Sequence, residues 1–351
     1  MLGGAAGLAA AGSAQARLPP GYPRSYAALQ AQAARESRLV IYSSAYVPDM
    51  TGMVSAFQAQ NPGIRVDYQH LVAVELYPRY LREVDSGAPS ADLLFSSVMD
   101  LQIKLVNDGY AQPYASPEKA HLPPWAVWKN EAYGITAEPI VIAYNRRLLS
   151  PSDAPRSHDQ LEWLLRRKGA AYAGRVGTYD VPRSGAGYLF FSQDVQINHD
   201  TWALIRSLGR THPVLDINGH DILERVSQGK QLIAYNMMSS YALERRATDP
   251  GLEVIYPEDY TLLMSRIAFI SKEARHPAAA KLFLDFMLSA AGQGLLAKRF
   301  MGPVRVDMPL VAPHADPQDL RAIHVGPSLL ANLDRLKYAR MVADWRKQLK
   351  A

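Results

Sequence analysis

Residues 180–188 hold the grouping best suited to bind a charged ligand. Arg183 and Ser184 stand before Gly185 and Ala186, between a predicted strand and a predicted helix. Ser184 is a suitable N-cap, and the free N–H groups of Gly185, Ala186 and Gly187 would then face the crevice at the end of the strand. A helix N-terminus of this kind binds anions, and Arg183 would add a charge-assisted hydrogen bond to a carboxylate or phosphate. The competing interpretation is an ordinary Ser-capped helix without a ligand.

Two serine pairs occupy equivalent places earlier in the chain. Ser43 and Ser44 follow the apolar run 39–42, with Tyr46 close behind, and Ser96 and Ser97 follow the run 93–95. Each pair would lie at the carboxyl end of a strand, beside an open helix N-terminus, where ligands of α/β sheets bind. Serines are common in loops. Their repetition in two successive strand-to-helix turns nevertheless favours ligand contact.

Weaker candidates follow two later strands. Tyr235 and Asn236 end a predicted strand, Tyr241 lies on the helix that follows, and Glu258 lies in a loop before the chain returns to its first half. The chain has 19 tyrosines, and a tyrosine at a strand end is more often half-buried packing with its hydroxyl hydrogen-bonded. Ligand contact by these four is therefore a hypothesis. Glu258 and Asp259 are also the carboxylate pair that would serve as acid and base if the protein were an enzyme.

Motifs of established catalytic and metal chemistry are absent from the sequence. It contains no G-x-S-x-G, H-E-x-x-H or G-x-x-x-x-G-K-[ST] motif. It also lacks cysteine, which excludes thiolate metal sites, disulfides and cysteine nucleophiles. The nine histidines show no metal-ligand spacing. We therefore expect no catalytic residue, metal or cofactor.

Composition indicates an exported globular protein without a membrane span. The net charge is +5, but the basic clusters are short, scattered and not interleaved with aromatic residues, which argues against nucleic-acid binding. No apolar run approaches the roughly 18 residues of a transmembrane helix. Residues 1–16 are Gly- and Ala-rich and end in the A-x-A form of a signal-peptidase site, so we expect a truncated signal peptide there. The alternative is a disordered tail on a cytosolic protein.

Apolar runs and helical periodicity alternate along the chain. This pattern predicts an α/β fold with two Rossmann-like lobes and a ligand cleft between them. The first lobe is expected over 38–140 and 265–310 and the second over 141–264, with crossings at the strands 140–144 and 265–270. Residues 17–37 would form an N-terminal arm, and residues 311–351 a C-terminal helical extension with a long helix over 329–349.

The segment 39–309 resembles bacterial extracellular solute-binding proteins of the ferric-iron and phosphorylated-solute branch, which serve ABC importers. The motifs that carry the resemblance lie at strand ends and in a late pair of helices, at residues 39–43, 91–96, 185–190, 276–286 and 302–305. The resemblance implies the type II periplasmic binding protein fold, whose two lobes close on a ligand by a hinge motion. It also implies a periplasmic protein that passes its ligand to a membrane permease, and we expect it to be a monomer.

The positions that hold iron in this family differ here. Where iron-binding members have a His, a Glu and adjacent tyrosines, this chain has Tyr46, Ser97 and a lone Tyr241. Ferric iron needs anionic oxygen ligands, and a neutral serine is a poor substitute. The expected ligand is therefore a small anionic organic solute, such as a phosphorylated sugar, a phosphonate or a carboxylate. Iron transport, a periplasmic sensor for a histidine kinase and an enzyme built on the same fold are the alternatives.

Overall fold

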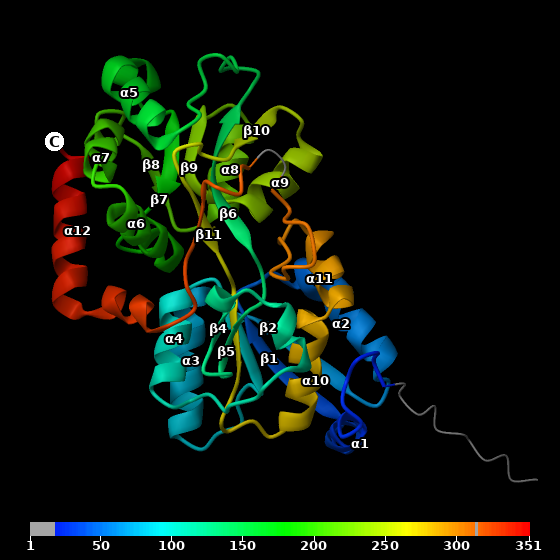
Figure 1. Cartoon of the computed structure of the whole chain (residues 1–351). Helices are drawn as coiled ribbons and strands as arrows, with labels where there is room; N and C mark the ends of the chain where they lie inside the picture. Colours follow the sequence, from blue (N-terminus) through cyan, green and yellow to red (C-terminus); the bar gives the residue numbers. More distant parts are fainter. Residues whose placement is uncertain (1–17, 313–314) are drawn as a thin grey trace, which may run out of the picture.

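The computed structural model describes residues 18–312 and 315–351, so the predicted leader over 1–16 lies outside the described part of the chain. The described residues form two α/β lobes, one above the other in Figure 1, each built on a mixed sheet with helices packed against it. This confirms the predicted two-lobed α/β fold. Within these residues, no helix is both long and apolar enough to cross a bilayer.

The sheet of the first lobe has the strand order β2-β1-β3-β12-β5-β4. Its central strands are parallel except for β12, which runs antiparallel to β3. Leu39 and Ile41 of β1 are fully buried, as expected for a strand covered on both faces. The strands are β1 (Arg38–Ser43), β2 (Arg65–His70), β3 (Leu93–Ser96), β4 (Val127–Trp128), β5 (Ala132–Gly134) and β12 (Ile267–Ile270). The helices that follow β1, β2 and β3 are α2 (Val47–Gln60), α3 (Ala73–Asp85) and α4 (Met99–Asn107).

The sheet of the second lobe has the order β13-β11-β6-β9-β7-β8, with β10 paired to β6. Its strands are β6 (Glu138–Asn145), β7 (Val176–Tyr179), β8 (Val214–Asp216), β9 (Ile233–Met238), β10 (Leu252–Ile255), β11 (Thr261–Met264) and β13 (Leu320–Ala322). Its helices are α5 (His158–Lys168), α6 (Gly185–Ile197), α7 (Thr201–Gly209), α8 (Gly219–Ser227) and α9 (Ser239–Thr248). Strands β7, β8 and β9 are parallel, so the turns after them open at one edge of the sheet.

The chain passes between the two sheets three times, from β5 to β6, from β11 to β12 and from β12 to β13. It leaves the first sheet after β5 and returns to it at β12. The predicted crossing strand over 140–144 corresponds to β6, which belongs wholly to the second sheet because Glu138 already pairs with Met264 of β11. The crossing therefore precedes β6, and the predicted lobe limits remain a prediction.

The two ends of the described chain return to the lobes. Helix α1 (Tyr26–Glu36), within the predicted N-terminal arm, packs on α10 (Pro277–Leu288), where the Glu36 carboxylate accepts hydrogen bonds from the first N–H groups of α10. Helix α11 (Ala290–Ala297) follows, which gives the helix pair expected late in the sequence.

Residues 320–349, which we call the strap, connect the two lobes. The strap consists of β13, the 3-10 helix η4 (Pro327–Leu333) and α12 (Arg335–Leu349). It is thus not wholly helical, and the helix predicted over 329–349 starts only at Arg335, because the Asp334 side chain caps it by accepting from Lys337 N. Helix α12 runs along the second lobe (Figure 1), with Trp345 buried in that lobe's core.

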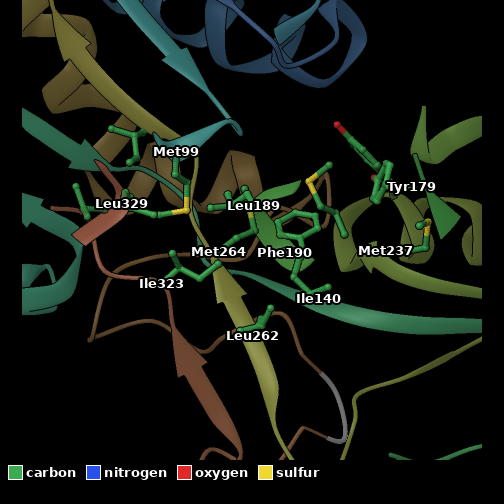
Figure 2. Close-up of a cluster of buried hydrophobic side chains, with 14 of the residues drawn as sticks. Met99, Ile140, Tyr179, Leu189, Phe190, Met237, Leu262, Met264, Ile323 and Leu329 are labelled. Atoms are coloured by element: carbon green, nitrogen blue, oxygen red, sulfur yellow. The ribbon is translucent and has the colours of Figure 1, made fainter. Parts of the chain in front are cut away.

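A core cluster between the lobes includes part of the strap. Figure 2 shows Leu329 and Ile323 of the strap beside Met99 of α4 and Met264 of β11, with Phe190 of α6 in the same cluster. These side chains are at most 2% exposed. Their burial holds the first turns of α4 and α6 close together, and both turns contribute to the site described next.

Candidate ligand-binding site

Six helices begin at the cleft between the lobes. The N-cap residues of α2, α3 and α4 from the first lobe and of α6, α8 and α9 from the second all line one cavity of about 210 Å³. These residues are Tyr46, Val72, Val98, Ser184, Asn218 and Met238. The first N–H groups of a helix lack intrahelical partners and carry its positive dipole end. Six such ends around one cavity create a region of positive potential.

The turn before α6 has the Ser184 cap predicted from the sequence, but the Gly187 N–H group, which was expected to be free, is the donor to that cap. Ser184 Oγ accepts a hydrogen bond from Gly187 N at 3.1 Å, and both Gly185 and Ala186 line the cavity. The Gly185 and Ala186 N–H groups donate to no other group among the described residues. Arg183 also lines the cavity with a side chain 71% exposed, and its Nη1 lies 3.6 Å from Asp180 Oδ2. The guanidinium is therefore available to a ligand.

The serine pairs of the first lobe divide between two roles. Ser44 and Ser97 line the cavity, and Ser44 Oγ accepts from Ser97 N at 3.1 Å, which ties the two turns together. Ser43 and Ser96 do not line it. Ser43 Oγ accepts from Ala45 N at 2.9 Å, and Ser96 Oγ accepts from Val98 N at 3.2 Å. These two serines therefore fix the shape of the turns.

Aromatic rings from both lobes meet at the cavity. The Tyr46 ring stacks on His70 with centroids 4.8 Å apart and contacts His220 of the second lobe at 5.0 Å. His220 in turn lies 4.1 Å from Tyr241. Burial lowers the pKa of His220 and raises the pKa values of Tyr46 and Tyr241, so these three rings are neutral near pH 7. The cavity therefore combines apolar ring faces with polar hydroxyl and amide groups.

Besides Ser43 and Ser96, three more of the predicted site residues do not line the cavity. Tyr235 and Asn236 donate hydrogen bonds to the buried Asp194 at 3.0 and 2.7 Å. Strand β9 continues to Met238, so Met238, and not Tyr235, is the residue that reaches the cleft. Glu258 is an exposed ion-pair partner of Arg156.

The carboxylate pair considered for an enzyme is not in the cleft. Asp259 accepts from His158 Nδ1 at 2.9 Å, and its neighbour Glu258 faces solvent beside Arg156. Neither residue lines the cavity between the lobes. Glu258 and Asp259 therefore do not form an acid–base pair at this site.

A buried ion pair lies beside the cavity where the chain crosses between the lobes. Arg266 Nε donates to Glu138 Oε1 at 2.9 Å, and both side chains are at most 1% exposed. Arg266 precedes β12 and Glu138 begins β6, so the pair joins the first two crossings. The Arg266 guanidinium carbon also lies 5.8 Å from the centre of the Tyr241 ring. The pair thus connects the crossings to a residue of the site.

Comparison with known proteins identifies the family. The profile of bacterial extracellular solute-binding proteins matches residues 39–301. This chain belongs to that family. The substrate-binding protein of an ABC transporter from Agrobacterium tumefaciens shares 35% identity over 89% of this chain and 94% of its own, with a TM-score of 0.79.

More distant structures show the same fold. Iron-bound HitA from Pseudomonas aeruginosa has 21% identity and a TM-score of 0.72, covering 89% of this chain and 99% of its own. AfuA from Actinobacillus pleuropneumoniae, with fructose 6-phosphate bound, has 21% identity and a TM-score of 0.71, covering 89% and 98%. No curated protein matches the chain. The similarity of these two structures concerns the fold alone.

Among the described residues, one charged side chain, that of Arg183, lines the cleft cavity of this solute-binding protein. Among the described residues that line the cavity there is no Asp or Glu, and Arg183 is the one Arg or Lys. The described part of the chain also holds no group of three His, Asp or Glu side chains placed to bind a metal ion. The helix ends and the one charged side chain of the described lining therefore both contribute positive potential.

Sequence reasoning missed His70, Tyr179 and Asn218 as cavity residues. His70 ends β2, Tyr179 ends β7 and Asn218 caps α8. Each stands at the carboxyl end of a strand or at a helix start, as the predicted residues do. Applying the strand-end rule to the predicted strands would have found His70 and Tyr179, whereas Asn218 follows β8, a strand that was not predicted.

Proposed function

We propose that this protein captures a small anionic organic solute in the cleft between its lobes and delivers it to the permease of an ABC transporter. The convergence of six helix N-termini on a cavity without carboxylates is the observation that carries the proposal. Free N–H groups and the Arg183 guanidinium would pair with the ligand's charge, while Ser44 and Ser97 would donate from their hydroxyls. A phosphorylated sugar, a phosphonate and a carboxylate all have suitable chemistry. The proposed setting is the periplasm.

Ferric iron is a poorer match to the cavity. Tyr46, Tyr179 and Tyr241 are the tyrosines that line the cavity, and burial raises the pKa of each phenol, so that binding iron would first require costly deprotonation. A carboxylate to offset the charge of the metal is missing from the described lining. A periplasmic sensor would use the same binding chemistry, so that alternative differs only in the protein that receives the closed complex.

Replacement of Arg183 tests the proposal at a single side chain. We expect Arg183→Ala to weaken binding of the anion by about 1.5–3 kcal/mol, because a hydrogen bond to a charged group is lost. Calorimetric titration would use the best ligand from a panel of inorganic phosphate, hexose phosphates, phosphonates and di- and tricarboxylates. Arg38→Ala is the matched control, since Arg38 pairs with Asp67 within the first lobe at 2.9 Å. Equal affinity of both variants would remove Arg183 from the site.

A further inference from the structure

A second and larger cavity lies under the strap. This cavity of about 400 Å³, which we call the strap pocket, is enclosed by the first turn of α4, the loop and first turn of α6, and the strap. Tyr188 donates to Asn332 O and Tyr338 donates to Pro182 O, both at 3.1 Å, so the strap is fastened to the second lobe on either side of the pocket. The pocket therefore has walls from both lobes.

The strap pocket is separate from the ligand cleft. Val98, Arg183, Ser184 and Gly185 line both cavities, and an ideal Cβ built on Gly185 would lie only 3.0 Å from Val98 Cγ2. This close contact between α4 and α6 forms a partition. A solute in the cleft would thus leave the strap pocket available to another molecule.

Two buried polar side chains in the strap pocket retain unused hydrogen-bonding capacity. Asn332 is 4% exposed, and its Nδ2 has no hydrogen-bond partner among the described residues. Asp100 is 2% exposed, and its carboxylate accepts from Leu101 N at 2.9 Å but forms no ion pair with any described Lys, Arg or His. An unpaired buried carboxylate and an unpaired amide donor are costly to retain without a ligand.

The remaining walls are mostly apolar. Leu101, Val181 and Leu333 line the pocket together with the rings of Tyr188 and Tyr338, which lie 4.7 Å apart. Arg183 and Arg335 line it as well, and both are exposed. The interior thus offers an apolar surface with one carboxylate and one amide donor.

We propose that the strap pocket is a second binding site, which takes a small apolar molecule carrying a protonated amine and a hydrogen-bond acceptor. The ammonium would pair with the Asp100 carboxylate, the acceptor would take the Asn332 Nδ2 hydrogens, and the apolar body would pack between Leu101 and the tyrosine rings. Because both lobes form the pocket, its occupation would favour the closed arrangement. By linkage it would then raise the affinity of the cleft for its own solute.

The charge preference of the pocket tests the proposal. Saturation-transfer NMR and calorimetry at pH 7.5 would compare 2-phenylethylamine with 2-phenylethanol and 3-phenylpropionate, which share a ring and differ in charge. We expect the amine to bind best, and its affinity to fall by about tenfold or more in Asp100→Asn, the range for loss of a charged hydrogen bond. Leu333→Trp, which fills the pocket and leaves Asp100 in place, should also abolish amine binding.

The outcomes separate this site from the cleft. A single cooperative melting transition for each variant would show that Asp100→Asn and Leu333→Trp are folded. Equal binding of amine and alcohol, preference for the propionate, amine binding that survives both substitutions, or no binding by any of the three probes would each overturn the proposal. None of these results depends on whether the cleft ligand is an anion.

Discussion

Ser97 is the cavity residue at which a negative charge can be added with least disturbance to the surrounding structure. It lines the cavity at the start of α4, and its backbone N–H is held by Ser44 Oγ. Ser97→Asp would place a carboxylate among six helix N-termini, where it would occupy the proposed anion site and repel a ligand of the same sign. We expect it to lower anion affinity by about a hundredfold or more, corresponding to at least about 3 kcal/mol.

The neutral variant Ser97→Asn controls for side-chain size. It should lower affinity by less than about tenfold, because it adds similar volume without charge. Both affinities would be measured by calorimetric titration. If Ser97→Asp bound the anion as tightly as Ser97→Asn did, the cleft would not select its ligand by negative charge.

Asp100 should make the stability of the protein depend on pH in an unusual direction. Burial raises its pKa to about 6, whereas an Asp in an unfolded chain titrates near 4. Above pH 6 the folded state therefore holds a charge that the unfolded chain accommodates more easily, and this penalty disappears as the pH falls from 6 towards 4. Asp100→Asn should be more stable than the natural protein by about 1–3 kcal/mol at pH 7.5.

The difference between the two proteins should shrink towards zero at pH 4.5. Urea unfolding at pH 7.5, 6.0 and 4.5 would measure it. A stability difference that stayed constant over this range, or a less stable variant at pH 7.5, would contradict the account of Asp100 as a buried and unpaired carboxylate.

At the site, prediction from sequence succeeded where local rules govern geometry. The Ser184 cap and the free N–H groups of Gly185 and Ala186 followed from residue order alone. The sequence could not distinguish Ser44 from Ser43, because which serine faces the cavity depends on the twist and length of β1. Asn236 was misplaced for a similar reason, since β9 runs two residues beyond its predicted end.

Among the secondary-structure elements, the helices α4 and α6 approach each other across the cleft at their first turns. The lack of a side chain at Gly185 lets Val98 approach, since a Cβ there would lie 3.0 Å from Val98 Cγ2. We expect Gly185→Ala to separate the two helices and weaken solute binding by about 1–3 kcal/mol, the usual cost of overpacking. Small-angle scattering would show a larger radius of gyration for the liganded variant.

A second substitution tests whether this contact is the cause. Val98→Ala removes the two methyl groups that the new Cβ would meet, so Val98→Ala/Gly185→Ala should recover most of the lost affinity. Calorimetric titration of the two single variants and the double variant forms a mutant cycle. Additive effects would show that Gly185 acts on the ligand or the backbone, and not through Val98.

The order of the elements was easier to predict than their edges. Strand and helix alternation gave the two lobes, and a small-residue run identified α10 and α11. The pairing of Glu138 with Met264 of β11 was not predicted, because it is a contact between residues far apart in sequence. Strand β13 was not predicted for the same reason, since its three residues form a strand by pairing with β11, which is far away in sequence.

For the whole molecule, an ion-pair cluster bridges the lobes at the opposite side from the strap. Arg299, which follows α11, donates to Asp49 of α2 in the first lobe at 2.8 Å and also pairs with Glu244 of α9 in the second. We expect Arg299→Gln to favour the open arrangement and to weaken solute binding by about two- to fivefold, because partly exposed pairs contribute about 0.5–1 kcal/mol. The effect should fade at high salt.

Arg38→Gln is the control for Arg299→Gln, because it breaks an ion pair of similar length within the first lobe. Its affinity and its radius of gyration should match those of the natural protein. The bridging role of Arg299 would be refuted if the two variants had the same affinity and the same salt dependence.

The most direct test of the whole account compares anions with neutral molecules of the same skeleton. Thermal shifts of the phosphate-free protein would be recorded with fructose 6-phosphate and fructose, ethylphosphonate and ethanol, succinate and succinamide, and with ferric citrate beside citrate. A ligand present at about a thousand times its Kd stabilises by about 4 kcal/mol, which moves the Tm by several degrees. The account predicts a shift with at least one anion and none with its neutral counterpart. Equal shifts within a pair, or a shift with ferric citrate that citrate alone does not give, would contradict it.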